Sequence, residues 1–310
     1  MRITSMAEKA VSILNNIRIR EVDQAELADV VDLYLTARND MLARNGANPG
    51  PVTADDRAGN EAGYRHILQT GIMRVAEVDG RLSGVSLAIV RDGNWFLSGF
   101  WVHPAMQGRG IGGPLLREVW NQGAARGART YSVWASSDKT ALGTYMKLGM
   151  LPGYQLMKFG GAVANKPRIP VGYGLDDLPL STAVAIDERV RGTGREMDHL
   201  WWQMQPGMSG SLVTYDDRPA GYFYRRGGAI GPVAWLDPAD ADGVLGLAIR
   251  AGAASDPVGS EVSLTCPGAA SAAIRIALGA GLKLTGFSHF LMTAPCGMPD
   301  RYLPSGPLLY

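Results

Sequence analysis

The alternation of apolar and polar positions divides the N-terminal part of the chain into one strand and one helix. Ile17–Val22 ("IRIREV") alternates apolar and charged residues, as a half-buried strand does. The following segment, residues 24–42, places Leu27, Val30 and Tyr34 at helical spacing, and Asp23 stands in front of it where it can cap the first turn. Residues 43–64 are rich in Gly, Pro, Asn and Asp and predict a long loop before a short helix near Glu61–Leu68.

Residues 72–104 predict an antiparallel meander. Three strand-like runs are separated by the dipeptides Asp79-Gly80 and Asp92-Gly93, and Asp-Gly between alternating runs is a strong signal for a tight hairpin. Further along, the pattern predicts a helix over 112–125, a strand over 129–136, a helix over 138–149 and a strand over 154–161. The fold class is therefore mixed α/β, with a mostly antiparallel front half.

A second copy of this pattern follows a boundary rich in proline and glycine at 164–179. "VHPAM" at 102–106 parallels "LDPAD" at 236–240, and "KLGM" at 147–150 parallels "GAGL" at 279–282, with offsets of 134 and 132 positions. Two nearly equal offsets indicate one duplicated fold. We therefore predict a first domain over 1–163, a linker over 164–179 and a second domain over 180–310, each a mostly antiparallel sheet flanked by helices.

Charge and composition narrow the function classes. The chain has 310 residues and a formal charge of +1, so it has no global field to attract nucleic acid or anionic lipid. It has no apolar run of about 18 residues, and charged and amide residues interrupt the apolar patch at Ala10–Leu14, which predicts neither a membrane span nor an export signal. Cys266 and Cys296 lie 30 positions apart without metal-ligand spacing. These features predict a cytoplasmic protein with two reduced thiols and without a metal site.

The segment after the third strand of the meander carries the candidate chemistry. "QGRGIGG" at 107–113 follows a strand that ends at Val102 and leads into a helix. Backbone N–H groups at such a strand-to-helix turn form an anion site, and glycine lets a phosphate approach without meeting a Cβ atom. Gln107 and Arg109 add side-chain donors. The spacing fits neither the P-loop nor the dinucleotide-binding fingerprint.

This loop resembles the pyrophosphate loop of the GNAT superfamily of N-acetyltransferases, whose signature is Q/R-x-x-G-x-G/A. Gln107, Gly110 and Gly112 stand at its fixed positions. The later "DKTALGTYMKLGM" is similar to the family's N-x-x-A-x-x-x-Y helix, with Asp138 in the Asn position and Tyr145 in the Tyr position. The resemblance implies two GNAT-like domains in tandem and acetyl-coenzyme A as co-substrate. It also implies a general acid, Tyr145, and a donor site made of Val102, Gln107, Gly108, Arg109, Gly110, Ile111, Gly112 and Asp138.

Three readings in the first domain stay open. The strand at 94–102 has no carboxylate that accepts the proton of an amine, so the base is His103, Glu77 or a chain of water molecules. Tyr145 is either the acid or a residue that packs its ring on a buried helix face. Asp138 either contributes to the donor site or only caps its helix.

The second copy lacks the residues that are expected to bind the donor and to act as the acid in the first copy. Aligning Pro104 with Pro238 places Ala241 at Gln107 and Asp242 at Gly108, and the later offset places Ala277 at Tyr145. The second domain thus resembles a degenerate GNAT domain with a structural or acceptor-binding role, and an unrelated α+β domain is the alternative. Trp201 and Trp202 either fill the space between the domains or line an acceptor pocket. The segment 297–310 is a closing strand or an ordered tail.

We therefore expect an N-acetyltransferase that joins the acetyl group of acetyl-coenzyme A to a small-molecule amine by direct attack in a ternary complex. Both cysteines lie in the second domain, which disfavours a covalent route. The alternatives are a longer acyl group on coenzyme A or on a carrier protein, and a non-catalytic regulatory protein that binds coenzyme A. The acceptor and the oligomeric state stay open.

Overall fold

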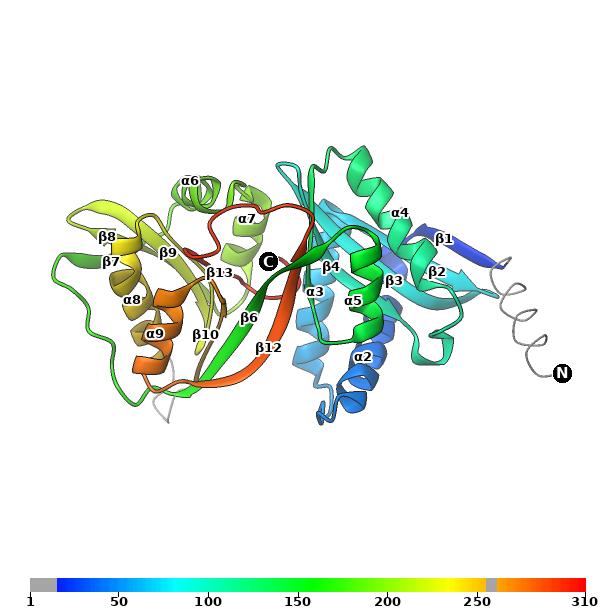
Figure 1. The fold of residues 1–310 in the computed structure, drawn as a ribbon, viewed down its shortest axis with the longest axis horizontal. Coiled ribbons are helices and arrows are strands. Elements are labelled where there is room, and N and C mark those ends of the chain that lie inside the picture. Colours follow the sequence, from blue (N-terminus) through cyan, green and yellow to red (C-terminus); the bar gives the residue numbers. More distant parts are fainter. Residues whose placement is uncertain (1–15, 255–260) are drawn as a thin grey trace. The chain divides into compact units, whose positions relative to one another are not determined.

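Two compact units make up the chain. The structure, a computed structural model, describes residues 16–254 and 261–310, and it divides into a first unit, residues 1–129, and a second unit, residues 130–310 (Figure 1). The N-terminal patch at Ala10–Leu14 lies outside the described residues. None of the helices within the described ranges is long and apolar enough to cross a membrane.

The first unit contains the predicted antiparallel meander. Its strands are β1 (Ile17–Glu21), β2 (Ile72–Val78), β3 (Arg81–Arg91) and β4 (Asn94–Val102), each paired with the next. Asp79 and Gly80 have φ values of 50° and 74°, and Asp92 and Gly93 have 49° and 86°. Two consecutive positive φ values define the tight hairpin turn that matches the twist of the strands, so the prediction from the Asp-Gly dipeptides is confirmed.

Helices cover this meander. They are α2 (Leu27–Arg44), α3 (Ala54–Thr70) and α4 (Gly112–Ala125), with short 3-10 turns at Gln24–Glu26 and Pro104–Met106. α3 is longer than the predicted helix because Thr53 and Asp56 form a capping box that starts it at Ala54. α4 packs Ile111 and Leu115 on Ala76 and Val78 of β2.

The second unit contains a meander of the same form. β7 (Tyr173–Asp177), β8 (Met208–Tyr215), β9 (Arg218–Arg226) and β10 (Ala229–Trp235) pair in order. Successive residues of β9 point to opposite faces: Phe223 joins the core under α8 (Ala241–Ala253) and α9 (Ser271–Gly279), whereas Tyr222 and Tyr224 contact α7 (Glu196–Met204). α6 (Leu180–Arg191) packs beside α7, so this sheet is covered on both faces (Figure 1).

The last strands of the two repeats are exchanged. β5 (Thr130–Ala135), β12 (Lys283–Met292), β6 (Leu151–Ala162) and β11 (Glu261–Pro267) lie side by side in that order. Figure 1 shows the neighbouring pair β6 and β12. β5 and β6 start 131 and 132 positions before β11 and β12, so they are counterparts. The strand β12 of the second repeat therefore pairs with β5 of the first, and β6 of the first repeat pairs with β11 of the second.

This exchange explains where the compact units divide. Strand pairing draws residues 130–163 into the second unit, although the repeat assigns them to the first copy. β7 lies inside the segment 164–179 that was predicted as a linker. The predicted domain boundaries divide the chain by its sequence repeat, whereas the compact units divide it by contacts. The predicted boundaries therefore stay a prediction.

Matching irregularities support the duplication. In β4 the register against β3 shifts between Leu97 and Gly99, and in β10 the register against β9 shifts between Ile230 and Val233, which places a bulge in each strand. Each strand is followed by a 3-10 turn, at Pro104–Met106 and Pro238–Asp240, with the expected offset of 134.

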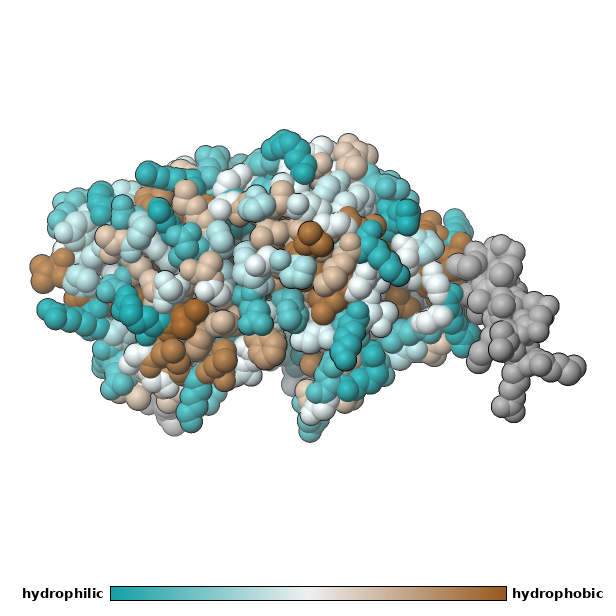
Figure 2. Space-filling model, in the orientation of Figure 1, coloured by the Kyte–Doolittle hydropathy of each residue, from teal (hydrophilic) through white to brown (hydrophobic). Residues whose placement is uncertain are grey.

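On the face shown in Figure 2, hydrophobic side chains form small separate groups, and one of them lies over α9.

Candidate functional site

The end of β4 and the loop after it form the candidate donor loop, residues 102–112. The bulge in β4 lies at Ser98, whose Oγ atom is buried and makes no hydrogen bond within the described part of the chain. The strand then continues to Val102, which packs at the edge of the cluster around Ile111. The bulge re-aims the end of β4, and the loop begins where β4 ends.

The glycines of the loop serve two different purposes. Gly108 and Gly110 have φ values of 74° and 84°, a conformation that residues with a Cβ atom rarely adopt. A Cβ atom built on Gly108 would meet nothing within 4 Å, so this part of the backbone is open. A Cβ atom on Gly112 would instead lie 2.9 Å from the ring of Phe100. Gly108 therefore leaves room outside the loop, whereas Gly112 lets α4 pack against β4.

Gln107 ties the loop to the elements around it. Its Nε2 atom donates to the carbonyl of Val102 at 3.1 Å, and its Oε1 atom accepts from Arg44 at the end of α2 at 3.3 Å. The side chain of Gln107 thus holds the loop in place. The donors for an anion are the backbone N–H groups of the residues that follow Gln107.

Positive charge gathers at the start of α4. Arg109 and Arg117 are exposed, and neither forms an ion pair or a hydrogen bond with any residue that the structure describes. Ile111, the cap position of α4, makes no side-chain capping bond, and Pro114 in the first turn has no N–H group. The helix dipole adds partial positive charge at this end. The arrangement suits a diphosphate, because this segment offers backbone N–H groups, an open glycine and the exposed cations Arg109 and Arg117.

Tyr145 lies in the second unit on α5 (Lys139–Lys147), and Asp138 directly precedes this helix. Asp138 caps this helix, because its Oδ1 atom accepts from the backbone N–H groups of Thr140 and Ala141 at 2.9 and 3.0 Å. Tyr145 is only 6% exposed, and burial, followed by the charge of Asp138, raises its pKa above the ordinary value. Its hydroxyl therefore keeps its proton at neutral pH. The roles of both residues in catalysis and donor binding stay predictions.

The candidate bases are occupied in structural contacts. The Nδ1 atom of His103 accepts from the backbone N–H of Ala105 at 3.3 Å and caps the 3-10 turn. Glu77 accepts from Arg20 at 2.9 Å, and Arg20 also bonds to Glu26. Protonation of Nδ1 would break the cap that His103 makes, and protonation of Glu77 would weaken its ion pair with Arg20, which favours water as the path.

The second repeat has no loop at this position. Five residues separate the 3-10 turn from α4, whereas α8 begins at Ala241, directly after the corresponding turn. Residues 241–244 are helical, so the alignment of Ala241 with Gln107 places helix against loop. The ring of Tyr173 packs on Gly243, and the hydroxyl of Tyr173 donates to Asp240 at 2.8 Å. A tyrosine and a carboxylate thus cover the end of α8 where an anion would bind.

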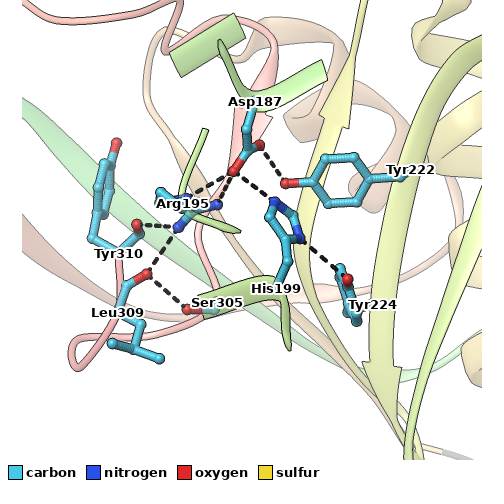
Figure 3. A network of polar contacts seen from close by, with 8 residues as sticks. All are labelled: Asp187, Arg195, His199, Tyr222, Tyr224, Ser305, Leu309 and Tyr310. Atoms are coloured by element: carbon cyan, nitrogen blue, oxygen red, sulfur yellow. Dashed lines mark hydrogen bonds and ion pairs between the residues drawn. The ribbon is translucent and has the colours of Figure 1, made fainter. Parts of the chain in front are cut away.

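A buried polar network, which the sequence pattern did not reveal, lies in the second unit (Figure 3). Its centre is Asp187 on α6, which is 0% exposed. Oδ2 of Asp187 accepts from Nε of Arg195 at 2.7 Å and contacts Nε2 of His199 at 3.1 Å, and Oδ1 accepts from Tyr222 at 2.5 Å. Nδ1 of His199 bonds to Tyr224 at 3.1 Å. The sequence pattern of α6 does not predict that Asp187 is buried, because Asp187 lies among charged residues in the sequence.

The tail is ordered and held by this network. Tyr302–Leu303 form β13, which pairs with β10, so of the two alternatives left open for this segment the structure has the strand. Arg195 donates to the backbone carbonyls of Leu309 and Tyr310 at 3.0 and 2.7 Å. Trp202, 2% exposed, packs against His199 within the same unit.

Both cysteines are free thiols. Burial raises the pKa of Cys266 to about 12, and burial also raises the pKa of Cys296. Neither is a thiolate at neutral pH, so neither is an activated nucleophile. Among the residues described, no group of three or more His, Cys, Asp and Glu side chains is placed to hold a metal ion.

Comparison with known proteins finds one family that is similar to part of the chain. Residues 44–150, which include the whole donor loop and Tyr145, match the acetyltransferase (GNAT) family. This part of the chain is therefore similar to a GNAT domain. The prediction drawn from Gln107, Gly110 and Gly112 is confirmed at the level of the family. No curated protein sequence matches the chain.

Solved structures extend the likeness beyond the GNAT domain. A putative acetyltransferase from Pyrococcus horikoshii is 18% identical with a TM-score of 0.73, and the match covers 95% of this chain and 96% of that one. A GCN5-related N-acetyltransferase from Sphaerobacter thermophilus is 17% identical with a TM-score of 0.63, over 92% and 98% of the two chains. A tandem GNAT protein from the clavulanic acid biosynthesis pathway is 15% identical with a TM-score of 0.59, over 90% and 99%. The predicted fold, two GNAT-like halves in tandem, is confirmed.

Proposed function

We propose that the chain transfers an acetyl group from acetyl-coenzyme A to the amine of a small molecule. The donor loop carries this proposal, because it combines an open glycine at φ 74°, an uncapped helix start and the unpaired Arg109. A diphosphate needs N–H donors and positive charge in the same place, and this segment offers both. The match to the GNAT family supports the donor, and the acetyl group is the simplest acyl group for it.

The residues of the chain divide the work as follows. The donor loop binds the diphosphate, and Gln107 keeps the loop against the end of β4. The bound thioester supplies the electrophilic carbonyl. Tyr145 stays protonated because burial raises its pKa, and its hydroxyl donates to the sulfur that leaves. A thiol has an ordinary pKa of about 8.5, so Tyr145 stabilises the leaving sulfur chiefly as a hydrogen-bond donor.

The amine loses its proton to water rather than to a side chain. β4 contains no carboxylate, and His103 and Glu77 are held in other contacts. The reaction then runs best above the pKa of the acceptor amine. Holding donor and acceptor together supplies most of the rate in a direct transfer.

The experiment that tests the function has two parts. Calorimetry with acetyl-coenzyme A measures whether one molecule binds per chain, and a free-thiol assay against a panel of small amines measures turnover. One site with amine-dependent thiol release supports the proposal. One site without release across the panel points to the non-catalytic alternative or to a different donor, and absence of binding overturns the assignment of the donor loop.

A further inference from the structure

The second unit contains a cavity that the acetyl-transfer proposal does not use. It measures about 290 Å³ and lies between the sheet face that carries Lys158 and Thr265, the helix α7, and the tail segment from Pro304 to Leu309. Lys158 and Thr265 are direct partners in the pairing of β6 with β11. A water molecule takes about 30 Å³, so the cavity has room for about ten of them, which corresponds to a small organic molecule.

The polar lining of this cavity is cationic. Lys158 from β6 and Arg226 from the end of β9 both line it, and the described lining residues include no Asp or Glu. Neither Lys158 nor Arg226 has an ion pair or a side-chain hydrogen bond with another residue of the described ranges. Ser263, Thr265 and Ser305 add hydroxyl groups, which accommodate either donors or acceptors. Two unpaired cations in one lining favour an anion.

The remaining wall is mostly apolar. Trp201 and Trp202 of α7 line the cavity together with Met208 and Ile230. Indole rings offer broad faces for an aromatic or aliphatic body, and a ligand site commonly joins such a wall to a few polar groups that orient the ligand. The lining therefore fits a molecule with one anionic end and one apolar end.

The buried network described above fixes two sides of this cavity. Trp202 lies under the guanidinium of Arg195, 4.9 Å from ring centroid to Cζ, and its ring packs edge-on against His199 at 5.3 Å. The tail side is held by Arg195, which donates to the carbonyl of Leu309, and by Ser305, whose Oγ donates to the same carbonyl at 3.2 Å (Figure 3). A lining that is already held in place loses little freedom on binding.

We propose that this cavity binds a small organic carboxylate with an aromatic or aliphatic body. The guanidinium of Arg226 matches a carboxylate in geometry, Lys158 adds a second charge, and the apolar end of the ligand lies against Trp201. The site consists of residues of the second unit only and is independent of the donor loop. The second half of the chain is then a ligand-binding module, although it has lost the donor loop.

The probe is phenylacetate, compared with hexanoate and with the neutral isostere phenylacetamide. Calorimetry on the full chain, without acetyl-coenzyme A, measures affinity and stoichiometry. We expect one phenylacetate or hexanoate per chain, binding that weakens as ionic strength rises, and affinity for phenylacetamide at least about tenfold lower. Lys158→Gln and Arg226→Gln should each weaken phenylacetate binding at least about tenfold.

Matched controls separate the site from general charge. Lys166→Gln and Arg168→Gln remove the same charges from exposed residues of the same unit that do not line the cavity, and they should leave the affinity unchanged. Melting curves check that all four variants fold. The proposal is overturned if neither carboxylate binds at millimolar concentration, if phenylacetamide binds as tightly as phenylacetate, or if the cavity variants behave like their controls. A separate titration in which acetyl-coenzyme A does not bind would contradict the assignment of the donor loop and would leave the proposal for this cavity unaffected.

Discussion

Side chains in this molecule differ in how many of their polar atoms are bonded within the fold. Arg109 is exposed and unpaired, so its charge is available to a ligand, whereas Asp187 is enclosed and bonded on both oxygens. The first kind of residue is expected to change binding without changing stability, and the second kind is expected to do the reverse. Three predictions at this scale follow from the contacts.

Arg109→Glu should weaken acetyl-coenzyme A binding at least about tenfold and leave the melting temperature unchanged, because it reverses a charge that no folded contact uses. Arg168→Glu, the same change on an exposed residue of the second unit, is the control and should bind normally. Calorimetry measures both. Equal affinity in the two variants would contradict the assignment of the loop.

Tyr145→Phe should lower kcat by about tenfold to a hundredfold and leave the affinity for acetyl-coenzyme A nearly unchanged, since only the donated hydrogen bond is lost. Because burial raises the pKa of Tyr145, this residue does not titrate below about pH 10, and the pH profile of the variant should keep the shape of the wild type. A profile that changes shape between pH 6 and 9, or a variant at full rate, would place the acid elsewhere.

Asp187→Asn should lower the free energy of unfolding by about 3 kcal/mol or more, because it leaves Arg195 buried without its counter-ion. Burial alone would raise the pKa of Asp187, but Arg195 and His199 outweigh it and lower the pKa to about 2. A carboxyl with a lowered pKa stabilises the fold above about pH 4, and this contribution is lost as pH falls from about 4 to about 2. Urea unfolding at pH 7 and pH 3 measures both effects. The difference between wild type and Asp187→Asn should be smaller at pH 3, and an equal difference would contradict the ionised state.

Short elements show which parts of the fold follow from local sequence. The Asp-Gly hairpins and the donor loop were predictable because glycine and aspartate select particular φ values. The start of α3 was missed, although Thr53 and Asp56 carry its signal, because the glycines and prolines before it dominate the composition. The buried network was not predictable, since Asp187, Arg195 and Tyr222 meet only in the folded unit.

The glycines of the donor loop give a prediction at this scale. Gly108→Ala should weaken acetyl-coenzyme A binding and cost about 1 kcal/mol of stability, because alanine disfavours φ 74° and its methyl group enters the open space. Gly127→Ala is the matched control: Gly127 follows α4 at φ 80° with nothing within 4 Å of an added Cβ, so this change should cost about the same stability and leave the affinity unchanged. Calorimetry and urea unfolding measure the pair. The same affinity in both variants would contradict the role of Gly108.

At the scale of the whole molecule, the repeat is visible in the sequence but the exchange of strands is not. Offsets of 134 and 132 positions predicted two copies, yet no local pattern says that β12 pairs with β5 rather than within its own copy. Pairing partners far apart in sequence are set by the whole sheet, so the predicted boundaries describe the repeat and the compact units describe the contacts.

The exchange predicts that neither copy folds alone. Residues 1–163, expressed without the rest, leave β5 and β6 without the strand between them, and residues 164–310 leave β11 and β12 without β6. Each piece should aggregate or remain unfolded because it exposes open strand edges. The two pieces produced together should form a soluble complex with the circular dichroism spectrum of the intact chain. A soluble, folded 1–163 piece would contradict this reading.

The position of β12 also sets the order in which the chain can assemble during its synthesis. Residues 283–292 leave the ribosome more than 120 positions after β6 and about 150 after β5, yet both of these strands have β12 as a neighbour. Until then the two earlier strands have an open side, at a translation rate of about 5 to 20 residues per second. The nascent protein therefore passes several seconds in a state that chaperones recognise, and this sheet closes only after residue 292 has been synthesised.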